Sequence, residues 1–391
     1  MAEVNRFWRQ LGIATNWPIL VAVAVLTAVG CGSIAADATA NVRMQLIFIA
    51  IGAVGMFLFQ VVNYQEIGRY AWLFYIVSLL LVIYTVMPGV RRTGFGSVPN
   101  IKGAQAWIDF GPLHLEPAEL MKLAFCMVLA RYLRFRSNYR SLGGLLPPFA
   151  LALVPLVLIL KQPALGMALL FIPALFSMLF VAGAKIKHLS GIVVLGLMFV
   201  PVVWFAGTGA PVLRHLPPLL KEYQRARVKA LLSHDSNQAQ SLDFQQEQAL
   251  TAIGSGGVTG KGFGHIPVGS RVPEAHNDMI FALIAEQFGL VGSLILLGAY
   301  VVLFAAGVEI SAATREPFGR LLAVGIVAML TSQAFLNLAV CLRLAPVTGI
   351  TLPFVSYGGS SMLSSFLAAG LLLNIGQNRP LVLARSSFEY D

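Results

Sequence analysis

The sequence is poor in charged residues. Only 11% of its 391 residues are Asp, Glu, Lys or Arg, whereas a soluble domain carries about 25%. This difference excludes an ordinary soluble enzyme, and it also excludes a disordered protein, which would be polar and highly charged. With 57% hydrophobic residues and a mean hydropathy of +0.78, we expect a polytopic membrane protein. Its apolar runs are long and continuous, which favours helices over a β-barrel.

Cysteines and acidic residues are also scarce. Cys31, Cys126 and Cys341 lie far apart, within or at the end of apolar runs, so we expect packing residues and no disulfide framework. No His or Cys cluster has metal-ligand spacing. The shortage of acids leaves a net charge of +10. In a membrane protein this charge indicates basic cytoplasmic loops and contact with anionic membrane lipid, rather than nucleic acid.

Long apolar stretches predict an all-α polytopic membrane protein with about ten transmembrane helices, forming a single transmembrane domain over residues 1–391. Each stretch is near or above the roughly 20 residues that cross a bilayer. The stretches are 17–36, 44–63, 70–87, 117–133, 145–162, 165–183, 189–207, 279–306, 320–342 and 357–377.

The Lys and Arg residues of the short loops predict the orientation. They concentrate on the side that holds the N-terminus, which places both termini (1–16 and 378–391) in the cytoplasm. The first large outside loop is then 88–116, and a long outside loop, 208–278, joins the seventh and eighth helices. Within it, residues 219–232 are typical of a basic amphipathic helix at the interface. A cleaved signal peptide at the N-terminus is disfavoured, because the first apolar run is long enough to span.

A glycine-rich run, Ser255 to Gly262, superficially matches a phosphate-binding loop. Ser255 stands where the Walker pattern has Gly, and Gly262 stands where it has Ser or Thr. We therefore exclude a nucleotide site. The run instead predicts tight turns that let the backbone approach a ligand closely.

Asp278 is the most informative single residue, because it lies where the eighth apolar stretch begins. A carboxylate at the membrane rim must face water or a polar cavity. It could stabilise a helix N-terminus through the macrodipole, or it could act as a general base. The neighbouring His276 and Glu274 favour the second interpretation.

Further polar residues interrupt the apolar stretches. Glu119 and Lys122 share one helix face, and they predict either an internal ion pair or, as we favour, a polar cavity for a charged substrate. Glu286 is expected to pair with Lys122 or an arginine. Ser356 and Tyr357 lie in a Pro- and Gly-containing break, typical of a helix that lines a cavity or a transporter site.

Four motifs together resemble those of the SEDS family, which includes RodA, FtsW and SpoVE. They cover nearly the whole chain in family order. The matching residues are 103–108 with 117–122, 252–262, 273–282 with Glu286 and 289–292, and 353–360.

The resemblance implies a ten-span peptidoglycan glycosyltransferase. Members of this family polymerise lipid II, a disaccharide-pentapeptide on undecaprenyl pyrophosphate, at the outer face of the cytoplasmic membrane. They work with a class B penicillin-binding protein, the transpeptidase that cross-links the strands. The resemblance places the family's essential aspartate at Asp278.

A substrate site can be assigned around this aspartate. A pyrophosphate leaving group requires cations, for which the candidates are Lys122, Arg225, Arg227 and Lys261. Glu119, His276, Glu286, Ser356 and Tyr357 complete the expected substrate-binding set. No cofactor is assigned, although a divalent cation could assist the leaving group.

The sequence departs from the family pattern at four positions. Ala106 replaces Arg, Ala164 replaces Asp, Asn277 replaces Thr and Ala118 replaces Ser. The lost charges leave open a scaffold that recruits or activates a penicillin-binding protein. The intramembrane Glu119, Lys122 and Glu286 leave open a lipid II transporter, because they would suit a polar pathway. The subtype is open as well. Residues 223–228 and 162–163 favour the elongation type, towards which we lean, whereas 273–276 and 349–353 favour the division type.

Overall fold

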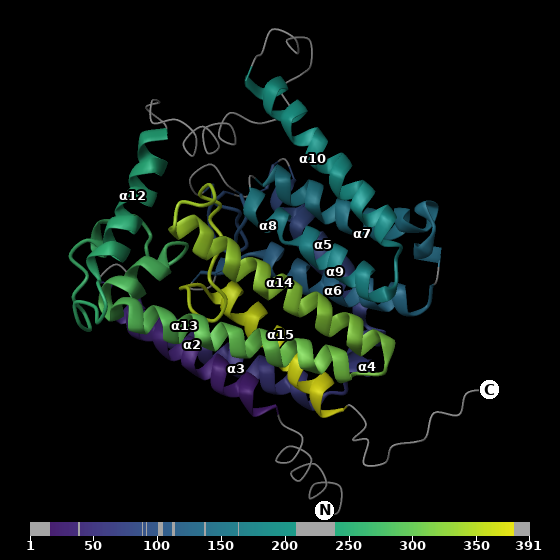
Figure 1. Ribbon diagram of the computed structural model, residues 1–391, viewed down its shortest axis with the longest axis horizontal. Coiled ribbons are helices and arrows are strands. Elements are labelled where there is room, and N and C mark those ends of the chain that lie inside the picture. Colours follow the sequence, from purple (N-terminus) through teal and green to yellow (C-terminus); the bar gives the residue numbers. More distant parts are fainter. Residues whose placement is uncertain are drawn as a thin grey trace, which may run out of the picture.

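The computed structural model describes residues 16–378, apart from 38–39, 88, 91, 101–104, 112–113, 137, 163 and 209–238. For 199–208 and 239–243 it describes the backbone only. Most of the described chain is helical (Figure 1). The helices are α2 (Trp17–Ala35), α3 (Val42–Val61), α4 (Tyr64–Arg69), α5 (Ala71–Val86), α6 (Pro117–Arg134), α7 (Leu142–Lys161), α8 (Leu165–Leu169), α9 (Phe171–Ala182), α10 (Ile186–Thr208), α12 (Ala239–Ser255), α13 (Ile280–Ala313), α14 (Pro317–Cys341) and α15 (Gly359–Gln377). Two short strands, β1 (Ile108–Asp109) and β2 (His114–Leu115), pair antiparallel.

Each expected membrane span overlaps a helix, which confirms the all-α polytopic class. Among the described residues, seven helices are long and apolar enough to cross a membrane, and α5 and the first part of α10 are shorter apolar helices. The sixth span is divided into α8 and α9, and the eighth continues as α13 to Ala313. Within the expected outside loop 208–278, residues 239–255 form α12. The number of membrane crossings stays a prediction.

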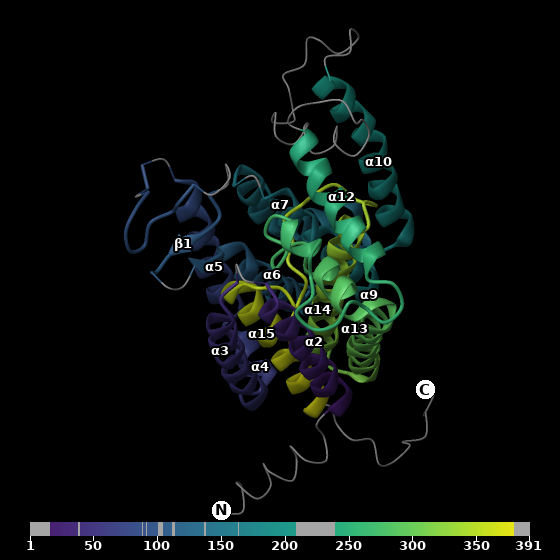
Figure 2. The same cartoon turned by 90° about the vertical axis from the view of Figure 1, so that its left-hand side faces the viewer.

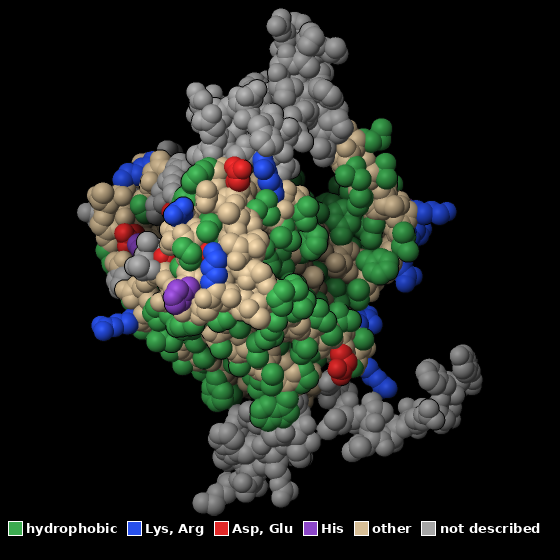
Figure 3. Space-filling model, turned by 60° about the vertical axis from the view of Figure 1, so that its left-hand side comes forward, with side chains coloured by type: hydrophobic (Ala, Val, Ile, Leu, Met, Phe, Trp, Pro, Cys, Tyr) green, Lys and Arg blue, Asp and Glu red, His purple; other side chains and the backbone are tan. Residues whose placement is uncertain are grey.

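The most buried helix is the last one. About nine-tenths of α15 is buried, because it packs against α3, α6 and α14 (Figures 1 and 2). α13 packs against α2 and α14. Large apolar side chains on the outer helices stay exposed, and hydrophobic side chains cover much of the lower part of the face in Figure 3. In a bilayer this apolar surface meets hydrocarbon, so its exposure is expected.

The predicted outside and inside segments gather at opposite ends of the molecule. At one end Asp37 contacts His276, and the Ser360 hydroxyl donates to the carbonyl of His114. At the other end Arg131 donates to the Gly68 carbonyl, and Arg134 pairs with Glu316. The start of α2 and the end of α15 lie close together on one side in both ribbon views (Figures 1 and 2). This arrangement agrees with the predicted alternation of loops, although which end faces the cytoplasm stays a prediction.

The glycine-rich run packs against a break in α13. Gly289 has φ 61° and ψ −157°, which interrupts the helical hydrogen bonding. The run supplies the missing partners: the Lys261 N–H donates to the Glu286 carbonyl (3.0 Å), and the Leu290 N–H donates to the Gly257 carbonyl (2.9 Å). Backbone groups at membrane depth need such partners. The tight turns we expected are therefore present, and they approach α13 closely. Their approach to a ligand stays a prediction.

This contact predicts that Ala substitutions at two glycines of the run have very different effects on stability. Both have positive φ, but a Cβ at Gly260 would lie 2.1 Å from the Gln287 carbonyl oxygen, whereas a Cβ at Gly257 would meet nothing within 4 Å. Gly257→Ala should therefore cost only the backbone strain, about 1 kcal/mol, and Gly260→Ala should lower the melting temperature of the purified protein considerably more. Equal melting temperatures would contradict the docking of the run on α13.

Candidate functional site

Asp278 is the last residue of a short backbone segment, residues 276–278, which we call the Asp278 strip. Other parts of the fold form a hydrogen bond with each of its residues. The carbonyls of His276, Asn277 and Asp278 all accept hydrogen bonds. The donors are the Tyr357 N–H (2.9 Å), the Ser356 hydroxyl (2.5 Å) and the Asn337 side-chain amide (2.8 Å), in that order. Asp278 is partly exposed as a whole residue, and the Oδ1 atom of its carboxylate is buried. A carboxylate fixed in this way at a helix start is suited to accept a proton from a bound substrate, since pre-organised positioning is what general-base catalysis requires.

The break before α15 supplies two of those three donors. Residues 342–358 are non-helical, and within them the Leu352 N–H donates to the Ser356 hydroxyl at 2.7 Å. Gln45 of α3 donates to the Ser356 carbonyl and accepts from the Gly358 N–H. The predicted substrate residues Ser356 and Tyr357 therefore lie beside the Asp278 strip. In the structure, the Ser356 hydroxyl and the Tyr357 N–H position the backbone of residues 276–277. Direct contact of Ser356 and Tyr357 with the substrate stays a prediction.

His276 has a partner that the sequence did not point to. Its Nδ1 lies 2.8 Å from Oδ2 of Asp37, which follows α2, and the Asp37 side chain is only 8% exposed. The His276 ring also meets the Tyr357 ring edge-on, with 5.4 Å between centroids. A carboxylate at one imidazole nitrogen orients the ring and fixes its tautomer. The signal for Asp37 was an acid at the end of the first apolar stretch, on the predicted outside.

Glu119 and Lys122 form a fully buried ion pair. Lys122 Nζ lies 3.0 Å from Glu119 Oε2, and the side chains are 1% and 0% exposed. Lys122 also donates to Gln333 of α14 (2.8 Å), and Ser364 of α15 donates to Glu119 (2.7 Å). Of our two interpretations, the geometry shows the internal ion pair, which joins α6, α14 and α15, and not the open cavity that we favoured. A role in substrate binding stays a prediction.

The expected partner of Glu286 was wrong. Among the described residues, this fully buried carboxylate pairs with Lys261 (2.5 Å) and not with Lys122 or an arginine. It also accepts from the backbone N–H groups of Val268 (3.1 Å) and Gly269 (2.6 Å). The break in α13 brings the run 255–262 alongside Glu286, a contact that no spacing in the sequence indicates. Lys261 thus anchors a loop, and only 28% of its side chain is exposed. A role in binding the pyrophosphate stays a prediction.

The structure describes only two of the four basic residues that we expected to bind the pyrophosphate. Lys122 and Lys261 lie in ion pairs, and Arg225 and Arg227 lie outside the described residues, as does the expected amphipathic helix 219–232. Within the described ranges, no group of three or more His, Cys, Asp or Glu side chains could hold a metal ion.

Glu116 is a second acid that sequence reasoning missed. It precedes α6, and its backbone N–H donates to the Ser360 hydroxyl (2.8 Å). Burial, reinforced by the neighbouring Glu119, raises the pKa of Glu116 to about 8, although Lys122 and a hydrogen bond from Trp107 oppose this shift. The folded protein therefore holds a proton at Glu116 that the unfolded chain would release at neutral pH.

This shift predicts the direction of a pH effect on stability. Because the pKa of Glu116 is raised in the folded state, its contribution is present at low pH and is lost as the pH rises through about 8. The wild type should lose melting temperature between pH 6 and 9, and Glu116→Gln should lose less. Glu247→Gln, at an exposed position on α12, is the matched control and should follow the wild type. Parallel curves for Glu116→Gln and wild type would contradict the assignment.

A comparison with the sequence models of known families shows the family to which this chain belongs. Residues 7–380 match the sequence model of FtsW, RodA and SpoVE, whose description is "Cell cycle protein". The chain belongs to this family. The SEDS membership expected from the four motifs is therefore confirmed, and with it the description of a multi-pass bacterial membrane protein.

Individual members of the FtsW, RodA and SpoVE family are similar over most of their length. A probable peptidoglycan glycosyltransferase FtsW of Trichlorobacter lovleyi is 32% identical over 87% of this chain and 84% of its own. The peptidoglycan glycosyltransferase MrdB of Escherichia coli K12 is 31% identical over 96% of both chains. A solved chain is 31% identical with a TM-score of 0.77, covering 94% of this chain and 99% of its own. Its structure is described as "Structural coordination of polymerization and crosslinking by a peptidoglycan synthase complex".

The departures from the FtsW, RodA and SpoVE pattern fall at ordered positions. Ala106 is buried beside β1, and Ala164 is the N-cap of α8. Ala118 is fully buried in α6, whereas the Asn277 carbonyl takes part in the Asp278 strip. Relatives of both the FtsW and MrdB types match at similar identity, so the elongation subtype stays a prediction.

Proposed function

We propose that this protein is a peptidoglycan glycosyltransferase that polymerises lipid II, with Asp278 as the general base. The observation that carries the proposal is that Asp278, a partly exposed residue, ends a strip in which the carbonyls of residues 276–278 all accept hydrogen bonds from other parts of the fold. The similarity of the chain to peptidoglycan glycosyltransferases of the FtsW and MrdB types supports glycosyl transfer as the class of reaction.

The chemistry assigns one step to this carboxylate. The acceptor sugar hydroxyl gives its proton to Asp278 while its oxygen forms a bond to the anomeric carbon of the donor. The bond from that carbon to the pyrophosphate breaks, and undecaprenyl pyrophosphate leaves with the electron pair. An α-linked donor and a β-linked product require inversion, for which one displacement with one base suffices, by analogy with inverting glycosidases.

The location and the partner belong to the same proposal. We place Asp278 at the outer face of the cytoplasmic membrane, with both termini inside, because the loops expected outside gather around it. The likeness to a chain of a peptidoglycan synthase complex supports a class B penicillin-binding protein as partner. The polymerised strands would then serve cell shape or division.

The test is lipid II polymerisation by the purified chain, alone and with its cognate penicillin-binding protein. Glycan strands from the wild type are expected. An absence of strands under both conditions, with the partner still bound, would instead support the scaffold function. Transfer of lipid II across a sealed vesicle without strand formation would support the transporter function.

A further inference from the structure

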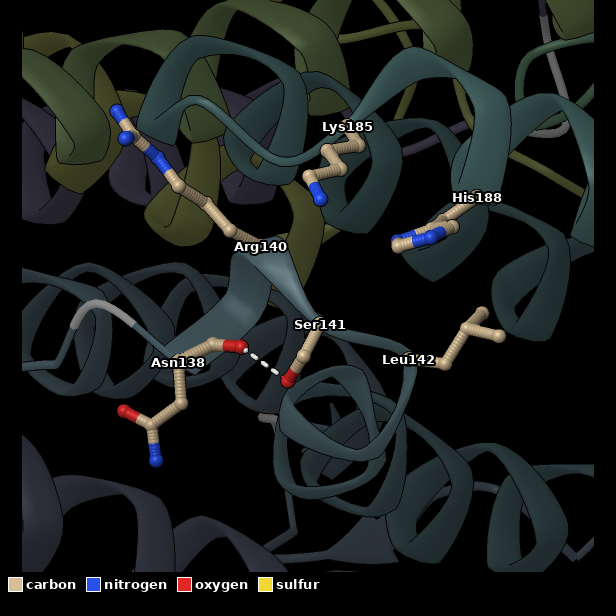
Figure 4. Close-up of a pocket in the computed structure, with 6 residues that line it drawn as sticks. All are labelled: Asn138, Arg140, Ser141, Leu142, Lys185 and His188. Carbon is tan, nitrogen blue, oxygen red and sulfur yellow. Dashed lines mark hydrogen bonds between the residues drawn. The ribbon is translucent and has the colours of Figure 1, made fainter.

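Two basic hollows flank η1, the short helix Asn138–Arg140. A hollow of about 400 Å³ is lined by Arg134, Arg136 and Arg320, among others. A second of about 490 Å³ includes Lys185 and His188 in its lining. Lys185 and His188 point into the space beside Ser141, whereas the Arg140 side chain turns away from them (Figure 4). These hollows lie far from Asp278, because Arg320 is in the first turn of α14 and Cys341, at the other end of α14, contacts the Asp278 carbonyl.

The first hollow has three arginines in its lining, and the neighbouring Glu316 can neutralise only one of these charges. Arg134 Nε lies 3.2 Å from Glu316 Oε1, and the other oxygen of Glu316 accepts the Gly319 N–H at 2.6 Å. Arg320 Nε is buried and has no hydrogen-bond partner among the described residues. Its position at the start of α14 is unfavourable for a cation, because the N-terminal end of the helix dipole is positive. An anion in this hollow would satisfy both Arg320 and the helix end.

Apolar side chains beside the cations suggest which anion binds. Phe135 is 64% exposed. The Arg134 guanidinium lies over the Phe135 ring, with 5.1 Å between Arg134 Cζ and the ring centroid. Leu142, which lines the second hollow, is 62% exposed. A soluble phosphate would gain nothing from these side chains. A lipid would use them, because its acyl chain can lie against apolar side chains while its headgroup meets the cations.

We propose that this corner of the protein binds the phosphodiester headgroup of an anionic phospholipid, with the acyl chains against Phe135 and Leu142. The leaflet is the one that we predict to be cytoplasmic. This site is separate from the glycosyltransferase site and does not depend on the reaction proposed for Asp278.

The experiment compares two double variants of the full chain in dodecyl maltoside. Arg136→Gln with Arg320→Gln removes two cations from the first hollow. Arg315→Gln with Lys187→Gln removes two exposed cations from the same end that line neither hollow. Native mass spectrometry measures occupancy by phosphatidylglycerol, with phosphatidylcholine and inorganic phosphate as the comparison ligands. We expect the first variant to bind phosphatidylglycerol about tenfold or more weakly, and the second to bind within about twofold of wild type.

Three results would overturn the proposal. Equal losses in the two double variants would show a diffuse surface charge and no site. Phosphatidylcholine bound as tightly as phosphatidylglycerol would show that the headgroup charge is not recognised. Inorganic phosphate that displaces phosphatidylglycerol at matched concentration would show a site for a free phosphoryl anion. If the first variant unfolds in detergent, the exposed Arg136→Gln alone replaces it, with an expected loss of about fivefold.

Discussion

Replacing Asp278 by Ala or Asn is expected to reduce glycan strand synthesis by at least about 100-fold, the lower end of the contribution of a positioned general base. Asn keeps the shape of the side chain and removes its basicity, so both variants should lose activity to a similar extent. The measurement is the rate of strand formation from labelled lipid II. Melting temperature and binding of the partner are measured on the same variants, so that a loss of folding is distinguished from a loss of the base.

A matched control is available in the same segment. Glu274 is an exposed carboxylate four residues before Asp278, and Glu274→Gln should retain most of the activity. If the Asp278 variants stay active while Glu274→Gln does not, the base is Glu274 and our assignment is wrong.

Replacing Lys122 by Met is expected to destabilise the protein by about 3–5 kcal/mol, because it leaves the fully buried Glu119 carboxylate without its cation. Glu119→Gln combined with Lys122→Met should recover much of this loss, since both charges are then gone. Heat unfolding in detergent measures the effect, and the double-mutant cycle gives the coupling energy.

A surface pair of the same spacing provides the control. Arg69 and Glu66 are also three residues apart, with 2.8 Å between their charged atoms, but their side chains are 69% and 48% exposed. Arg69→Met should cost less than about 1 kcal/mol. If Lys122→Met keeps full stability and loses only activity, the pair serves the substrate and does not lock the helices.

The sequence predicted the fold class well, because the hydrophobicity of a membrane helix is a local property. Boundaries such as 357–377 for α15 and 320–342 for α14 are close to the structure for that reason. The break at Gly289 was not predicted, because its apolar neighbours continue on both sides. It depends on the run 257–262, which supplies hydrogen bonds from far away in the chain.

The site was predictable in part for a similar reason. Asp278, Ser356 and Tyr357 belong to motifs that can be read from the sequence, and the structure brings them together. The pairs His276 with Asp37 and Glu286 with Lys261 join distant segments, so no spacing rule could have indicated them. Lys122 was predicted to face a cavity, but the helix packing that buries it is a property of α14 and α15 and not of its own helix.

The most direct test of the account is to measure undecaprenyl pyrophosphate release and strand growth together, with purified protein and its penicillin-binding protein. The account predicts that the wild type releases one undecaprenyl pyrophosphate for each disaccharide added, and that Asp278→Asn does neither. Release by Asp278→Asn at the wild-type rate, or wild-type strand growth without release, would contradict it.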